Sequence, residues 1–149
     1  MDLLEAYRML PADLWAAFPL VLTAVVGLVL VVWDAFWNDA PPIPWVAAGT
    51  LALALLWELG GLSRAPETAF YGLIRVGGMA SFVNAIILAS GLLTIALSVP
   101  YLKRIRHLHG EVYALILFAT VGMIVLASAN SLISVFVGLE TMSICLYIM

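Results

Sequence analysis

Five long apolar runs follow one another along this chain of 149 residues, and short polar connections separate them. An α-helix needs about 20 apolar residues to cross the hydrocarbon core of a bilayer. Only 10% of the residues are charged, whereas roughly a quarter are charged in a soluble domain. The sequence therefore predicts an all-α integral membrane protein with about five transmembrane helices, surrounded by membrane lipid.

The polar connections set the limits of the predicted helices. The stretch 38–44 cannot continue a helix, because it contains three prolines. Asp13 is expected to cap the first span, and Trp15, Trp33 and Trp37 are expected to lie at the membrane interfaces. The predicted elements are an N-terminal segment at 1–14, spans at 15–37, 44–62, 79–102, 111–129 and 131–149, a polar loop at 63–78 and a basic cytoplasmic loop at 103–110.

Polar side chains near the helix ends are interpreted as interfacial. Asp34 and Glu58 each lie close to the end of a predicted span, where a carboxylate can reach the headgroup region and water. Part of the loop at 63–78 is apolar enough to lie on the membrane surface. The residues expected there are Phe70, Tyr71, Leu73 and Ile74.

Small and polar residues recur at helical spacing on two spans. Small residues let helix backbones approach closely in a membrane, so both sets are interpreted as packing faces. Asn130 or Ser131 is expected to cap the last helix. The first set is Asn84, Gly91, Thr94 and Ser98, and the second is Ser131, Ser134, Gly138, Thr141 and Cys145.

The connection before the fourth span is strongly basic, with Lys103, Arg104 and Arg106 close together. Positive charge in short loops collects on the cytoplasmic side, which places the N-terminus outside. His107 and His109 are in the same loop, but two histidines without a third ligand do not predict a metal site. The formal net charge of −3 provides no basic surface for nucleic acid.

Glu140 is the acid inside the last apolar run. In a helix that starts near Ser131 it lies about nine residues in, roughly 13 Å along an axis that crosses a core about 30 Å thick. Ionisable residues at that depth are costly and mark functional sites. Glu140 points away from the small-residue face and shares its side with Phe136, Ser143 and Tyr147, two of which offer hydroxyl groups. It is the predicted functional residue of the chain.

The stretch 113–147 resembles the antiporter-like membrane subunits of respiratory complex I, the proton-translocating NADH:quinone oxidoreductase. Leu139 before the acid favours the subunit N (chain 2) branch, because the sister subunits typically place an aromatic residue there. Cys145 stands where the family often has a proline, and Gly77-Gly78 where it often has an aspartate. The residues that carry the resemblance are Gly122-Met123, Leu126-Ala127, Ala129-Asn130, Leu132, Phe136, Gly138-Leu139-Glu140, Met142-Ser143 and Leu146-Tyr147.

The resemblance implies a fourteen-helix antiporter-like fold with inverted repeats, of which this chain would cover the N-terminal part and be truncated at Met149. It implies that Glu140 pairs with a lysine on a later helix and tunes the proton affinity of that lysine. FMN, iron–sulfur clusters and the quinone site would belong to other subunits, so no cofactor is expected in this chain. The implied partners are protons, a neighbouring antiporter-like subunit and small K- and J-type subunits. The implied location is the bacterial inner membrane.

Two other interpretations use the same residues. A cation/proton antiporter subunit without redox chemistry would need the same intramembrane acid. Co-purification with quinone-reducing activity, or the sequence beyond Met149, would separate it from the first interpretation. In a structural membrane scaffold Glu140 would be inert, and its neutral substitution would have no consequence.

Overall fold

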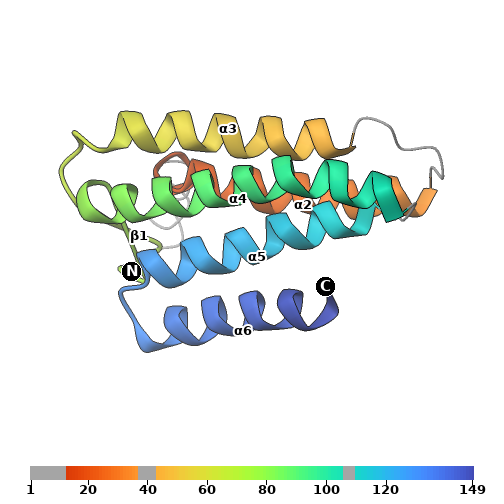
Figure 1. Ribbon diagram of the computed structural model, residues 1–149. Coiled ribbons are helices and arrows are strands. Elements are labelled where there is room, and N and C mark those ends of the chain that lie inside the picture. Colours follow the sequence, from red (N-terminus) through yellow and green to blue (C-terminus); the bar gives the residue numbers. More distant parts are fainter. Residues whose placement is uncertain (1–12, 37–42, 106–109) are drawn as a thin grey trace.

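The computed structural model describes residues 13–36, 43–105 and 110–149. Five helices lie side by side and alternate in direction, and a small β-hairpin covers one end of the bundle, hereafter the hairpin end (Figure 1). The end of α4 and the start of α5 lie at the opposite end. The elements are α2 (Phe18–Phe36), α3 (Ile43–Gly61), β1 (Glu67–Ala69), β2 (Ile74–Val76), α4 (Gly78–Ile105), α5 (Gly110–Ser128) and α6 (Leu132–Ile148), and residues 13–16 are also helical.

Length and composition make four of these helices capable of crossing a membrane: α2, α3, α4 up to Leu102, and α5. The helix α6 is also apolar but has 17 residues. Large apolar side chains cover the outside of the bundle, such as Leu28, Leu53 and Leu97. That arrangement suits a lipid solvent, in which helices satisfy their own backbone groups and present hydrocarbon outward.

The core forms where α2, α3 and α4 meet α5. Over half of the apolar window of α5 is buried (56%), against a third or less in the other three spans, so α5 is the central helix. Leu51, Leu88 and Leu117 are fully buried in one cluster. Gly91 of α4 lets the helices approach, because a Cβ atom there would lie 3.1 Å from both Leu51 and Thr120.

The region 63–78 contains a hairpin that the sequence did not reveal. Strands β1 and β2 pair antiparallel, with Thr68 opposite Arg75. Ile74 is buried against Ala17 and Ala69, so its expected position on the membrane surface is wrong, whereas Tyr71 and Leu73 are exposed. Burial was missed because one partner, Ala17, comes from a distant part of the chain and the other, Ala69, is brought close only by the hairpin.

The turn of the hairpin has an unusual backbone. Phe70 (φ 52°) and Tyr71 (φ 57°) adopt the left-handed conformation, which costs free energy for residues other than glycine. Asp13 stabilises the turn, since its carboxylate accepts a hydrogen bond from the Phe70 backbone N–H at 3.2 Å. Asp13 is itself helical, so its expected role as the cap of the first span is wrong.

The helix α4 is longer than the span predicted at 79–102. It continues through Pro100 to Ile105, so the first residues of the predicted basic loop are helical. The earlier end is expected at the first basic residue, Lys103, because a charged run suggests a loop. Trp37, Arg106, His107 and His109 lie outside the described residues.

Candidate functional site

The helix α6, which carries Glu140, begins at a well-formed cap. Ser131 has an extended backbone, and its side chain accepts a hydrogen bond from the Ser134 N–H at 3.2 Å. Of the two expected caps, Ser131 is therefore the one used. Asn130 instead holds the hairpin: its amide donates to the Gly72 carbonyl at 2.8 Å and accepts from Arg75 Nε at 2.8 Å.

The small-residue face of α6 packs on α5, as predicted. Ser134, Gly138 and Cys145 are buried there, and Ser131 and Thr141 are half-buried. The closest approach pairs Gly138 with Gly122 of α5. A Cβ atom on Gly138 would lie 2.7 Å from the Leu126 backbone nitrogen, and one on Gly122 would lie 2.6 Å from that of Met142. Backbone against backbone leaves no room for a side chain at either glycine.

Glu140 lies on the other side of α6, at the middle of the helix, eight residues from each end. Its neighbours on that side, Phe136, Ile144 and Tyr147, are all exposed. No hydrogen bond within the described part of the chain involves the Glu140 carboxylate, so Ser143 and Tyr147 do not donate to it there. In the described residues α6 packs on α5 and leaves this face uncovered (Figure 1).

A second carboxylate, Glu58, is buried, which corrects its interpretation as an interfacial acid. Only 7% of its surface is exposed. The Asn84 side-chain amide donates to Glu58 Oε1 at 3.2 Å and to Ser128 Oγ at 3.0 Å. These three residues, hereafter the Glu58 cluster, join α3, α4 and α5 near the hairpin end. A buried polar group needs such partners, because leaving it unpaired costs about 1–3 kcal/mol.

The packing face expected on the third span is correct in part. Asn84 and Gly91 are buried and Ser98 is half-buried. Thr94 is exposed, and its hydroxyl donates to the Ser90 carbonyl of its own helix at 2.8 Å. Asn84 serves as a polar link between helices and not only as a small packing residue.

Periodicity on α3 could have revealed the burial of Glu58. The residues that face the core recur at intervals of three and four, and Glu58 falls within that series. An acid in phase with small apolar residues belongs to the helix–helix interface, whereas an interfacial acid should fall out of phase. The series is Ala47, Leu51, Ala54, Glu58 and Gly61.

Asp34 also has a structural role that differs from the predicted solvated one. Its two carboxylate oxygens accept hydrogen bonds from the backbone N–H groups of Gly110 and Glu111, both at 3.2 Å. The first N–H groups of a helix have no partner within the helix, and a negative charge there also suits the helix dipole. Asp34 at the end of α2 therefore caps α5 from a different helix.

The known proteins that this chain resembles share one name. No protein-family model matches the chain. NADH-quinone oxidoreductase subunit N of Salinibacter ruber is 52% identical over all 149 residues, which cover 30% of that relative. The protein of the same name from Rhodospirillum rubrum is 38% identical over 89% of this chain and 28% of the relative. That from Rhodobacter capsulatus is 39% identical over 94% of this chain and 30% of the relative. The chain spans about 30% of the length of these relatives.

Proposed function

The chain belongs with the N-terminal part of NADH-quinone oxidoreductase subunit N, and from that premise we propose that it serves proton translocation in the membrane arm of complex I. It is a multi-pass membrane protein, in line with its four spanning-length helices. The proposed location is the bacterial inner membrane with the N-terminus outside.

The position of Glu140 carries the proposal. A carboxylate in the middle of an apolar helix, on a face that the described residues leave uncovered, is costly in lipid. The cost falls when an opposite charge lies beside it. We propose that a lysine on a later helix of the full subunit packs against this face and forms an ion pair with Glu140.

The proposed mechanism follows from the strength of charge interactions at low dielectric. While the pair is closed, the Glu140 carboxylate favours the protonated lysine, because a nearby opposite charge stabilises the charged form. When the pair opens, the lysine loses that stabilisation and gives up its proton more readily. Alternation between the two arrangements would move one proton from one side of the lysine to the other.

Electron transfer is proposed to occur elsewhere in the complex. The chain has a single cysteine, whereas an iron–sulfur cluster typically needs four cysteine ligands. We propose that FMN, the clusters and the quinone site belong to other subunits, as the resemblance to this family implies. The proposed partners of this chain are a neighbouring antiporter-like subunit and the small K- and J-type subunits.

The test is Glu140→Gln in the assembled complex, which keeps the shape of the side chain and removes its charge. Proton uptake into vesicles and NADH oxidation are measured together, and we expect fewer protons per NADH while the complex still assembles. Glu140→Asp keeps the charge and should retain much of the pumping. Glu111→Gln removes an exposed acid at the start of α5 and is the matched control.

Wild-type stoichiometry in Glu140→Gln would exclude the charge from the mechanism and favour the scaffold interpretation. Loss of pumping in the Glu111→Gln control as well would mean that any loss of an acid disturbs coupling.

A further inference from the structure

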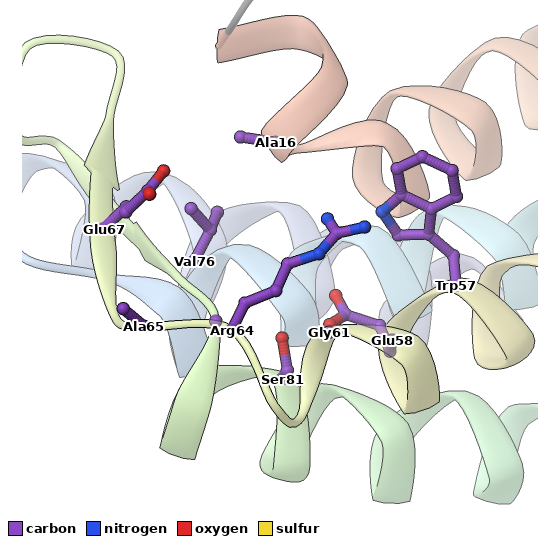
Figure 2. A pocket seen from close by; sticks show the side chains of 10 residues that line it. Ala16, Trp57, Glu58, Gly61, Arg64, Ala65, Glu67, Val76 and Ser81 are labelled. Carbon is purple, nitrogen blue, oxygen red and sulfur yellow. The ribbon is translucent and has the colours of Figure 1, made fainter.

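A cavity of about 210 Å³ opens at the hairpin end, directly beside Glu58 (Figure 2). Its wall combines the end of α3, the start of α4, the hairpin and the linker between α3 and β1. Although much of the bundle surface is apolar, this cavity is lined by several polar and charged side chains. These are Glu58, Arg64, Glu67 and Ser81.

The two oxygens of Glu58 have different surroundings. Oε1 accepts the hydrogen bond from Asn84 inside the bundle. Oε2 lies towards Gly61, which lines the cavity: a Cβ atom on Gly61 would be 3.7 Å from Oε2 and 3.0 Å from Ser81 Oγ. Within the described residues no side chain donates to Oε2. A carboxylate accepts several hydrogen bonds, so Oε2 needs water or a proton from the cavity side.

Glycine at position 61 leaves Glu58 Oε2 accessible from the cavity. Any side chain there would enter the narrow space between Glu58 and Ser81, because its Cβ atom would already be in contact with both. Figure 2 shows Glu58 and Ser81 on neighbouring helices at this wall of the cavity, with Arg64 extending towards Trp57.

A second, much smaller cavity also borders the Glu58 cluster. Its volume is about 10 Å³, and Glu58, Asn84 and Ser128 all line it. A cavity of this size holds about one water molecule when polar groups surround it. The Glu58 cluster is therefore bordered by two cavities, one of which has room for about one water molecule.

Two charged side chains, Arg64 and Glu67, also line the open cavity. The Arg64 guanidinium lies 5.1 Å from the centre of the Trp57 ring, in a cation–π contact that holds it near the cavity. Glu67 brings a negative charge to the wall of the same cavity. The other neighbours, Asn84 and Ser81, are neutral.

We propose that Glu58 is a buried proton-binding site that exchanges with water in this cavity. On uptake, a hydronium ion in the cavity gives its proton to Oε2, an O–H bond forms on the carboxyl group, and a water molecule remains. Release is the reverse step. The site is distinct from Glu140, which lies on another helix and another face, and its proton exchange does not require the Glu140–lysine pair. A purely structural role would instead keep Glu58 in one protonation state, tied to Asn84.

Infrared difference spectroscopy of the assembled complex between acid and alkaline pH tests the exchange. The wild-type difference spectrum minus that of Glu58→Gln should leave one C=O stretching band of a protonated carboxyl, shifted in D2O, which belongs to Glu58. Glu111→Gln, which removes an exposed acid on α5, should retain the band. Identical difference spectra for the wild type and Glu58→Gln would overturn the proposal. Proton pumping is measured in the same preparations, so that a failure of the Glu140 mechanism is seen separately.

Cysteine accessibility tests the cavity without altering Glu58. Ser81→Cys should react with a small water-soluble methanethiosulfonate, because Ser81 lines the cavity although it is only 4% exposed. Ala85→Cys, one turn further along α4, is the control: Ala85 is similarly buried at 8% and is not part of the cavity wall. No reaction at position 81, or equal reaction at both positions, would exclude a specific water path to Glu58.

Discussion

At the scale of single residues, acids with similar sequence surroundings have different roles. Asp34, Glu58 and Glu140 all occur in or beside apolar helices. Asp34 caps a neighbouring helix, Glu58 belongs to a buried hydrogen-bonded cluster, and Glu140 faces outward. What separates them is the rotation of each helix about its axis, because a difference of one residue turns a side chain by about 100°.

The cap formed by Asp34 gives the first residue-scale prediction. Asp34→Ala removes both acceptors from the start of α5, and loss of a capping side chain typically costs about 1 kcal/mol, or roughly a fivefold change in an equilibrium. We expect hydrogen exchange at the Gly110 and Glu111 amides to rise by about that factor. Asp34→Asn keeps one acceptor oxygen and should give a smaller rise, whereas unchanged exchange in Asp34→Ala would show that the cap contributes nothing.

At the scale of elements, the turn between α5 and α6 is fixed from two sides. Ser131 caps α6, and Asn130 binds the hairpin through its side chain, while its backbone N–H donates to the Leu73 carbonyl at 2.9 Å. Ser134 adds a hydrogen bond from its hydroxyl to the same carbonyl at 2.8 Å. The orientation of α6, and with it the direction in which Glu140 points, thus depends on the hairpin.

The Gly122–Gly138 contact gives a prediction for the element scale. Gly138→Leu forces a side chain into the backbone of α5, and overpacking of this kind typically costs about 1–3 kcal/mol. Val137→Leu is the matched control, because Val137 is 49% exposed and can accept a larger side chain. On native gels, Gly138→Leu should lower the yield of assembled membrane arm and Val137→Leu should not. Equal yields would mean that close approach at Gly138 is unnecessary.

The sequence was most informative about helices and least about the contacts between them. Apolar length alone indicated five helices, and the spacing of Ser134, Gly138 and Cys145 indicated the face of α6 that packs on α5. The Glu58 cluster was missed because its members are separated by 26 and 44 residues along the chain, and only the relative rotation of three helices brings them together. The hairpin was missed because its strands have three residues each, too few for a clear alternating pattern.

At the scale of the whole molecule, the bundle has two chemically different ends. The hairpin end holds the Glu58 cluster and the open cavity, while the end of α4, which carries Lys103 and Arg104, is at the other end (Figure 1). Glu140 lies between them, midway along α6. If the helices cross the membrane as their lengths allow, the cavity and the end of α4 face opposite compartments.

The last prediction concerns which compartment each end faces. Arg106→Cys places a thiol in the basic connection, and Glu67→Cys places one on β1 at the hairpin end. Positive charge in a short loop favours the cytoplasmic side, so a membrane-impermeant thiol reagent should reach position 106 only from the cytoplasm and position 67 only from outside. Spheroplasts and inverted vesicles supply the two orientations, and the parent chain with Cys145 alone supplies the background. Labelling of position 106 from outside would reverse the orientation, and labelling of both positions from one side would contradict the alternating arrangement of the helices itself.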